Sequence, residues 1–303
     1  MCASSVLTDY KLLIIPGRNA VYSALLFPHS CQGVEMMRTT IELLNQASLK
    51  SVLSRPNEGL MALTLLCLVE WPDGVQRQCY VKIFSQAQGL GVFNEILGYL
   101  LTKAEELPVA PKAGVLILPE ELKKEIAFPA APIAFLTSKI HGNSPSSFYN
   151  LGQALQFESL CKIIDGWEKL PQTIAFDEWV ANQDRNLGNV IIDANLNVTL
   201  IDHSNMPIDL DWTIPMLDAE IEPRNVLSDF FRSTPNLPQK MEIIRGASKQ
   251  ESSINLVRDE VRFWAERLLD NEQRENLMLF LERRAKLSNA RLSKKYGLLA
   301  GVA

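Results

Sequence analysis

The hydrophobic pattern of the first half of the chain is typical of strands. Two apolar runs, at residues 61–71 and 77–84, are separated by the turn Pro72-Asp73-Gly74. Such runs joined by a Pro-Asp-Gly turn are typical of an antiparallel hairpin. Further strands are predicted at residues 115–118 and 133–140. The first 140 residues therefore predict a small sheet with one or two helices.

Helical spacing of apolar residues appears between these strands and dominates the second half. Residues 93–106 carry apolar side chains at helical spacing, and Pro108 prevents the helix from continuing. Residues 40–50 predict a short amphipathic helix. Three longer stretches are predicted to be helical in the second half: 147–170, 173–182 and 254–287, the last divided near Asp270 and Asn271.

A cluster of helix-breaking residues at 141–147 predicts a hinge between two parts of the chain. We therefore expect a first domain at 1–140 and a second at 141–303. Their sequences predict an α+β fold, with strands concentrated in the first domain and helices in the second. The function of the first 40 residues is left open.

Composition places the chain among ordinary globular proteins. Its 303 residues are 47% hydrophobic, with a formal net charge of −5, so no general attraction to nucleic acid or anionic membranes is expected. The longest apolar run, 60–69, is about half the length of a membrane-spanning helix. No signal peptide is recognisable, and the five cysteines are dispersed. We expect a soluble cytoplasmic protein with reduced cysteines.

The stretch 176–204 holds the most informative polar residues. Two short apolar runs flank the turn-forming residues 193–197, which predicts a tight hairpin. Asn189 immediately precedes the first run and Asp202 immediately follows the second. Antiparallel pairing should place these two side by side, with Cα atoms roughly 5 Å apart. Asp184 lies across a glycine-containing loop and can fold back to the same end of the hairpin.

Two carboxylates and an amide at one end of a hairpin suit a particular chemistry. Oxygen ligands of this kind favour Mg²⁺, which keeps several waters and shares itself with phosphates. A carboxylate beside a substrate hydroxyl can accept its proton. Lys82 lies between Val81 and Ile83 in a predicted buried strand, where a lysine needs a partner or ligand. Glu95, in the first turn of the following predicted helix, is the expected ion-pair partner.

These residues resemble those of a known family. The spacing D-x-x-x-x-N, followed by Asp after a hairpin, resembles protein-kinase-like folds. Residues 176–185 (FDEWVANQDR) and 200–204 (LIDHS) resemble the HipA-like kinases, relatives of the phosphatidylinositol 3/4-kinase branch; Tyr80-Val81-Lys82 and Asn94-Glu95 also fit. The resemblance covers about residues 50–290. It implies a two-lobed kinase-like fold, with a small antiparallel-sheet N-lobe and a mostly helical C-lobe.

The resemblance also implies a function and a role for each matching residue. The function is ATP- and Mg²⁺-dependent phosphoryl transfer, most commonly to protein Ser or Thr; well-known family members are bacterial toxins, so an antitoxin or regulatory partner is a further expectation. The implied roles are proton acceptor for Asp184, Mg²⁺ ligands for Asn189 and Asp202, phosphate contact for Lys82, positioning of Lys82 for Glu95, and an adenine-binding hinge for residues 137–140, including Ser138 and Ile140.

The sequence departs from the family pattern in two places. Asn186 stands where the family's DRHxxN loop has His, so a mechanism that uses that imidazole does not apply. The phosphate-covering loop lacks GxGxxG, and only residues 55–59 lie between the predicted strands. Some family members carry serines there, which makes Ser51 and Ser54 candidate autophosphorylation sites.

Structural interpretations of the same residues remain open. Asp, Asn and Gly are common in turns, Lys82 could extend into water at a strand edge, and Glu95 could be an ordinary helix N-terminal acid. Arg185 is expected to pair with an acid, and His203 to be a hydrogen-bonded neighbour rather than a base. Five acids could recruit a basic substrate or lie on a solvated loop: Asp209, Asp211, Asp218, Glu220 and Glu222.

The basic tail 283–295, with six basic residues and no acid, is expected to be a solvated helix face, with a binding role as the alternative. Two alternative functions also stay open. One keeps the fold and changes the acceptor to a small molecule or a lipid. The other is a nucleotide-binding pseudokinase that serves as a partner module.

Overall fold

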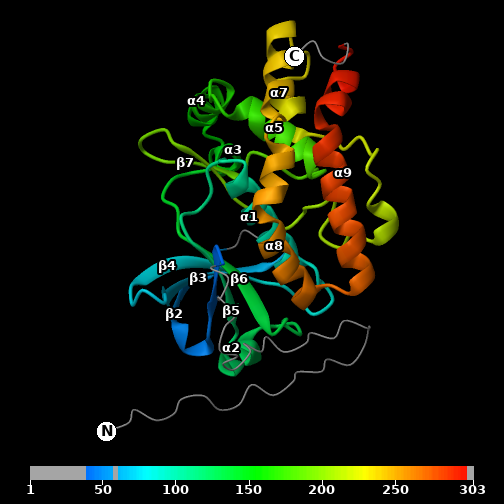
Figure 1. Ribbon diagram of the computed structural model, residues 1–303. Coiled ribbons are helices and arrows are strands. Elements are labelled where there is room, and N and C mark those ends of the chain that lie inside the picture. The colour runs from blue at the N-terminus through cyan, green and yellow to red at the C-terminus, as the bar shows by residue number, and fades with distance from the viewer. Residues whose placement is uncertain (1–38, 57–60, 299–303) are drawn as a thin grey trace.

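The computed structural model describes residues 39–56 and 61–298, and within them the protein is α+β (Figure 1). A mixed sheet lies at one end and most of the helices at the other. The strands are β1 (Ile41–Leu44), β2 (Leu49–Ser54), β3 (Leu63–Glu70), β4 (Gln76–Ile83), β5 (Ala113–Ile117), β6 (Ile133–Ser138), β7 (Val190–Ile192) and β8 (Val198–Leu200). The helices are α1 (Gly91–Ala104), α2 (Glu120–Glu125), α3 (Pro145–Asn150), α4 (Ala154–Asp165), α5 (Leu170–Trp179), α6 (Val226–Phe231), α7 (Leu237–Gly246), α8 (Gln250–Leu268) and α9 (Asn271–Lys295).

The main sheet has the strand order β1-β5-β6-β4-β3-β2 among the described residues. The predicted hairpin is confirmed, because β3 and β4 pair antiparallel from Leu63 opposite Ile83 to Glu70 opposite Gln76. The expectation of an antiparallel sheet is wrong at one edge, where β1 pairs parallel with β5. A parallel pair needs a long connection, and here that connection contains β2, β3, β4 and α1.

The helix predicted at residues 40–50 is wrong. This segment forms β1, a short 3₁₀ turn and the start of β2 instead. The main chain of Ile41 lies opposite Ala113 of β5, and its N–H donates to Glu260 Oε1 of α8 at 3.0 Å. Long-range pairing of the backbone therefore overrides an apolar spacing that also fits a helix.

Helix α1 lies at the centre of the molecule, between the sheet and the other helices (Figure 1). It packs against β6 on one side and α8 on another, and its first twelve residues are all buried. The predicted helix is confirmed, although it begins two residues earlier, which puts Glu95 in the second turn rather than the first. Apolar side chains on the other face of the sheet form a separate cluster that α2 covers through Leu122.

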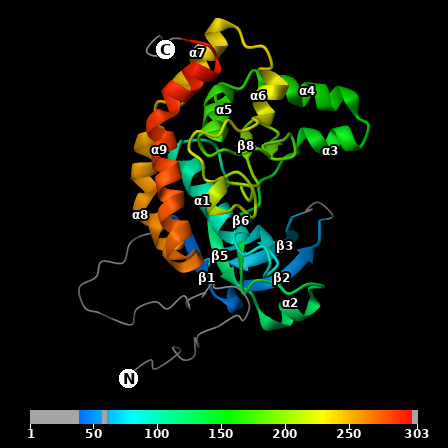
Figure 2. The same ribbon diagram turned by 90° about the vertical axis from the view of Figure 1, so that its right-hand side faces the viewer.

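The helical part follows residues 141–144, the start of the predicted hinge. Asn143 is tied to Ile192 of β7 by two backbone hydrogen bonds, so the segment is anchored to the helical part. Helices α3 and α4 project to one side in Figure 2, whereas α8 and α9 run side by side along the other. The predicted break between the last two helices is confirmed, with Asp270 capping the N-terminus of α9. Within the described residues, no helix is long and apolar enough to cross a membrane.

The basic tail is not simply a solvated face. Arg284 is fully buried and donates hydrogen bonds to the main-chain carbonyls of Glu178, Trp179, Ala219 and Ile221. Arg291 also donates to the carbonyl of Ile221 at 3.1 Å. Burial lowers the pKa of Arg284 to about 9. Part of the tail's charge therefore fastens α9 to the end of α5 and to the 219–221 segment.

Gly98 permits the close approach of α1 to the segment after β8. A Cβ atom at this position would lie 2.2 Å from Cβ of His203 and 2.4 Å from Cε of Met206. We expect Gly98→Ala to destabilise the protein by about 2 kcal/mol, because the added methyl overpacks a buried contact. In Gly166→Ala, by contrast, the new Cβ would approach other atoms no closer than 3.5 Å. Thermal unfolding that shows equal stability for the two variants would contradict this expectation.

Candidate functional site

The predicted hairpin at the centre of the site is confirmed. Strands β7 and β8 pair antiparallel, with Val190 opposite Leu200. The N–H of Ile201 donates to the carbonyl of Asn189 at 3.0 Å, so Asn189 lies opposite Ile201. The expectation that Asn189 faces Asp202 is therefore wrong by one residue. Asp202 comes directly after that pair and has a left-handed backbone, with φ of 58°.

Lys82 projects from β4 and is shared by two carboxylates. Its Nζ lies 2.5 Å from Oε1 of Glu95 and 2.7 Å from Oδ1 of Asp202. The side chain of Lys82 is 18% exposed, that of Glu95 is 2% exposed and that of Asp202 is 39% exposed. Lys82 therefore does not extend into water, and the sheet, α1 and the β8 segment meet at its ammonium group.

One ammonium cannot fully neutralise two carboxylates, and the pKa values of the two carboxyl groups shift in opposite directions. Burial alone would lower the pKa of Lys82, but Asp202 and Glu95 together raise it above its usual range. Burial opposes ionisation of Asp202, yet Lys82 and the Ser204 hydroxyl hold its pKa well below the usual range. Burial raises the pKa of Glu95 to about 7, although Lys82 opposes this. Asp202 is thus the firmly ionised member of the pair.

Asp184 is exposed and held by amide side chains. Its Oδ2 accepts a hydrogen bond from Asn205 Nδ2 at 2.7 Å, and its Oδ1 accepts one from Asn186 at 3.3 Å. Asn189 Nδ2 donates to the main-chain carbonyl of Asp184 at 2.7 Å, which closes the loop. Asn186 thus supports the loop through its own hydrogen bonds. The carboxylate of Asp184 remains open to an acceptor that approaches from solvent.

Asn189 and Asp202 offer oxygen atoms that could serve a metal ion. Within the described part of the chain, no hydrogen bond uses Asn189 Oδ1, while Oδ1 of Asp202 receives the bonds from Lys82 and Ser204. No cluster of three or more His, Cys, Asp or Glu suited to a metal is found among those residues. A site with so few protein oxygens suits Mg²⁺, which takes its other ligands from water and phosphate, and it does not suit zinc.

The predicted adenine hinge is only partly available. Ser138 ends β6 and is largely buried, and its Oγ accepts a hydrogen bond from the N–H of Lys112 at 3.2 Å. The N–H groups of Ser138 and Lys139 donate to the carbonyls of Lys112 and Gln78. Among the described residues, no hydrogen bond uses the N–H of Ile140. The main chain of Ile140, rather than the side chain of Ser138, is therefore free to contact a base.

One residue that holds this site, Asn94, was given no role of its own in the sequence analysis. Asn94 of α1 donates to the carbonyls of Ser204 and Leu210 at 2.8 and 3.0 Å and accepts from Trp212 Nε1 at 3.0 Å. It therefore fastens the segment after Asp202 to the helix that carries Glu95. The sequence signal was its place beside Glu95 in the Asn94-Glu95 pair, which did not show what the Asn94 side chain would contact.

The structure also places the acidic residues and the two serines considered in the sequence analysis. The five acids between Asp209 and Glu222 are all exposed, which agrees with a solvated loop. Ser51 and Ser54 are exposed on β2, where modification stays a prediction; residues 57–59 of the expected phosphate-covering loop lie outside the described residues.

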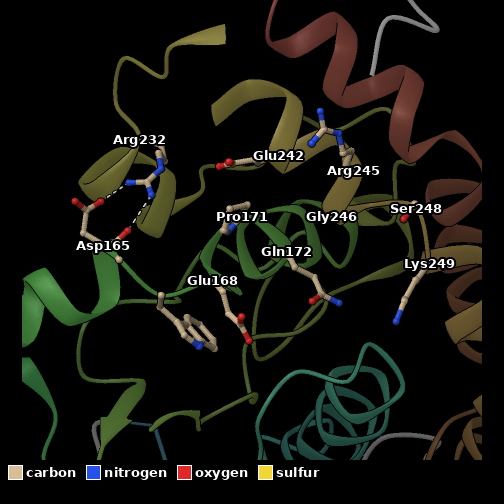
Figure 3. Close-up of a pocket in the computed structure, with 12 residues that line it drawn as sticks. Asp165, Glu168, Pro171, Gln172, Arg232, Glu242, Arg245, Gly246, Ser248 and Lys249 are labelled. Atoms are coloured by element: carbon tan, nitrogen blue, oxygen red, sulfur yellow. Dashed lines mark hydrogen bonds and ion pairs between the residues drawn. The ribbon is translucent and has the colours of Figure 1, made fainter. Parts of the chain in front are cut away.

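A cavity of about 580 Å³ lies away from the predicted residues, among α4, α5 and α7 (Figure 3). Its wall carries charges of both signs. Arg232 is paired there with Asp165, while Glu242 and Arg245 project from α7. This mixture does not select one ligand charge, and none of the predicted site residues lines the cavity.

No protein-family model matches the chain, and no curated protein matches it in sequence.

Proposed function

We propose that the protein is an ATP- and Mg²⁺-dependent phosphotransferase of HipA-like type with a two-lobed protein-kinase-like fold, whose acceptor is a Ser or Thr hydroxyl of a protein. The observation that carries the proposal is the convergence on Lys82. Two acids, one from α1 and one that follows a hairpin, lie within 2.7 Å of the ammonium nitrogen of a lysine from the sheet. Such a cluster provides both a cation for phosphates and a carboxylate for a metal.

The residues divide into those that bind nucleotide and those that handle the acceptor. Lys82, held by Glu95, would bind the α- and β-phosphates of ATP, and the main chain of Ile140 would meet the adenine. Mg²⁺, held by Asn189 and Asp202, would neutralise charge on the phosphates. The free Oδ1 of Asn189 supports this assignment.

Asp184 would orient the acceptor hydroxyl and take its proton while the hydroxyl oxygen bonds to the γ-phosphorus and the bond to ADP breaks. Its exposed carboxylate, fixed by Asn186 and Asn205, supports this role. Positioning and charge neutralisation then supply the rate enhancement, without a covalent enzyme intermediate.

The proposal is tested by transfer of label from [γ-³²P]ATP in a cell lysate, with wild-type protein and Asp184→Asn compared. We expect wild type to label one or a few protein bands and Asp184→Asn to lose that label, with a reduction of about 10³-fold. Label on a small metabolite or a lipid would change the acceptor class. Nucleotide binding without transfer by the wild type would contradict the proposal and favour a pseudokinase partner module.

A further inference from the structure

Arg185 follows the proposed proton acceptor Asp184 and is fully buried. Its guanidinium reaches a different chain segment from the one that carries it. Nη1 donates to the carbonyl of Ile201 at 2.8 Å, and Nη2 lies 3.2 Å from Nδ1 of His203. Ile201 and His203 are the two neighbours of Asp202, so one side chain contacts the residues on both sides of the proposed metal ligand.

The segment held in this way needs support. Asp202 has φ of 58°, a left-handed conformation that costs a residue other than glycine about 1 kcal/mol or more. Such a conformation persists only when its surroundings fix it. The contacts of Arg185 with Ile201 and His203 bracket the strained residue and restrict rotation on either side of it.

The guanidinium of Arg185 also fixes the tautomer of His203. Arginine has only donors, so Nδ1 of His203 must accept and the ring proton must lie on Nε2. The main-chain N–H of His203 donates to Glu95 Oε2 at 3.2 Å. The contacts therefore extend from Arg185 through His203 to the acid that holds Lys82.

A single buried acid anchors both loops to α5. Asp177 Oδ1 lies 3.4 Å from Arg185 Nε and accepts from Asn182 Nδ2 at 2.8 Å. Asn182 Oδ1 in turn accepts from the N–H of Asp184 at 3.0 Å. The carboxylate of Asp177 therefore anchors the segment of Asp184 through Asn182 and the segment of Asp202 through Arg185.

We propose that Arg185 is a positioning residue, which holds Asp202 in its left-handed conformation by contacting Ile201 and His203 and so fixes the metal-ligating carboxylate relative to Asp184. This inference rests on the proposed function, since it assigns a role within that site. A purely structural ion pair would affect only the stability of the fold. Loss of Arg185, as a positioning residue, should also weaken metal binding.

The test compares Arg185→Lys with Arg284→Lys. Arg284 is a matched control, because it is also fully buried and also donates to main-chain carbonyls, but those carbonyls belong to α5 and the 219–221 segment and not to the segment of Asp202. Binding of Mn²⁺ in the presence of a non-hydrolysable ATP analogue is measured by electron paramagnetic resonance, alongside thermal unfolding. We expect Arg185→Lys to bind Mn²⁺ about tenfold more weakly and Arg284→Lys to bind it as wild type does.

A second pair of variants covers the case in which Arg185→Lys fails to fold. His203→Leu removes the acceptor for Nη2, whereas His203→Asn keeps an acceptor near the position of Nδ1. Weaker Mn²⁺ binding in the leucine variant, with recovery in the asparagine variant, would support the positioning role. Unchanged Mn²⁺ binding in Arg185→Lys, an equal loss in both arginine variants, or an equal loss in both His203 variants would overturn it. Wild-type protein that binds no metal–nucleotide complex would overturn the proposed function itself.

Discussion

Replacing Lys82 by methionine should abolish binding of MgATP and destabilise the protein in a pH-dependent way. The substitution leaves Glu95, which is almost completely buried, without its cationic partner. The pKa of Glu95, already raised to about 7, should rise further when the lowering influence of Lys82 is lost. A carboxyl whose folded pKa exceeds its unfolded value costs stability as pH rises from the unfolded to the folded pKa, so a further rise of the folded pKa extends this loss to higher pH. We therefore expect the loss relative to wild type to be about 3 kcal/mol larger at pH 9 than at pH 6.

The double variant Lys82→Met/Glu95→Gln is the control for this prediction. It replaces the buried carboxylate by a neutral group of the same shape, so most of the stability at pH 9 should return while MgATP binding stays absent. Chemical unfolding at the two pH values measures the first effect, and calorimetric titration with MgATP measures the second. Lys82→Met that binds MgATP like wild type would contradict the role of this lysine.

Replacing Asp202 by asparagine should lower the rate of phosphoryl transfer about 10³-fold with little change in the fold. Asparagine adopts the left-handed conformation more readily than most residues, so the backbone at φ of 58° is preserved and only the charge is lost. Binding of nucleotide without metal should be retained, because the substitution also frees Lys82 from a competing carboxylate. Transfer rates and Mg²⁺ titrations measure both effects.

A charge-matched control for Asp202→Asn is Asp229→Asn, which removes an exposed acid that pairs with Arg224 in the helical part. We expect this variant to keep the wild-type rate and the wild-type Mg²⁺ requirement. Equal losses in the two aspartate variants would indicate a general effect of net charge and would contradict the metal-ligand assignment.

Local patterns were sufficient to predict elements whose pairing is local. The β3–β4 hairpin and the β7–β8 hairpin follow from apolar runs around turn residues, and the break before α9 follows from Asp270. The strand β1 could not be predicted in this way. Its structure depends on β5, about seventy residues later, and on a carboxylate of α8. No local spacing contains that information.

In the candidate site, too, some features could be predicted from the sequence and others depend on contacts that the local sequence does not contain. The sequence predicted the Lys82–Glu95 ion pair, and the resemblance implied that Asp202 shares their site. The structure brings the charged atoms of all three into contact. The hairpin spacing misplaced Asp202 by one residue, because β8 ends at Leu200 and Ile201 is the residue opposite Asn189. The resemblance implied a hinge role for Ser138, whose Oγ accepts from the N–H of Lys112, directly before β5. This is a long-range contact that the local sequence does not encode.

In the proposed function, Lys82, Asn189 and Asp202 together hold a metal–nucleotide complex. The most direct test of this assignment is a crystal structure with Mn²⁺ and a non-hydrolysable ATP analogue, in which anomalous scattering locates the metal. We expect one anomalous peak within about 2.5 Å of Asn189 Oδ1 and of an Asp202 carboxylate oxygen, with phosphate oxygens in contact with Lys82. A nucleotide bound elsewhere, or a metal that contacts neither residue while Lys82 still pairs with Asp202, would contradict it.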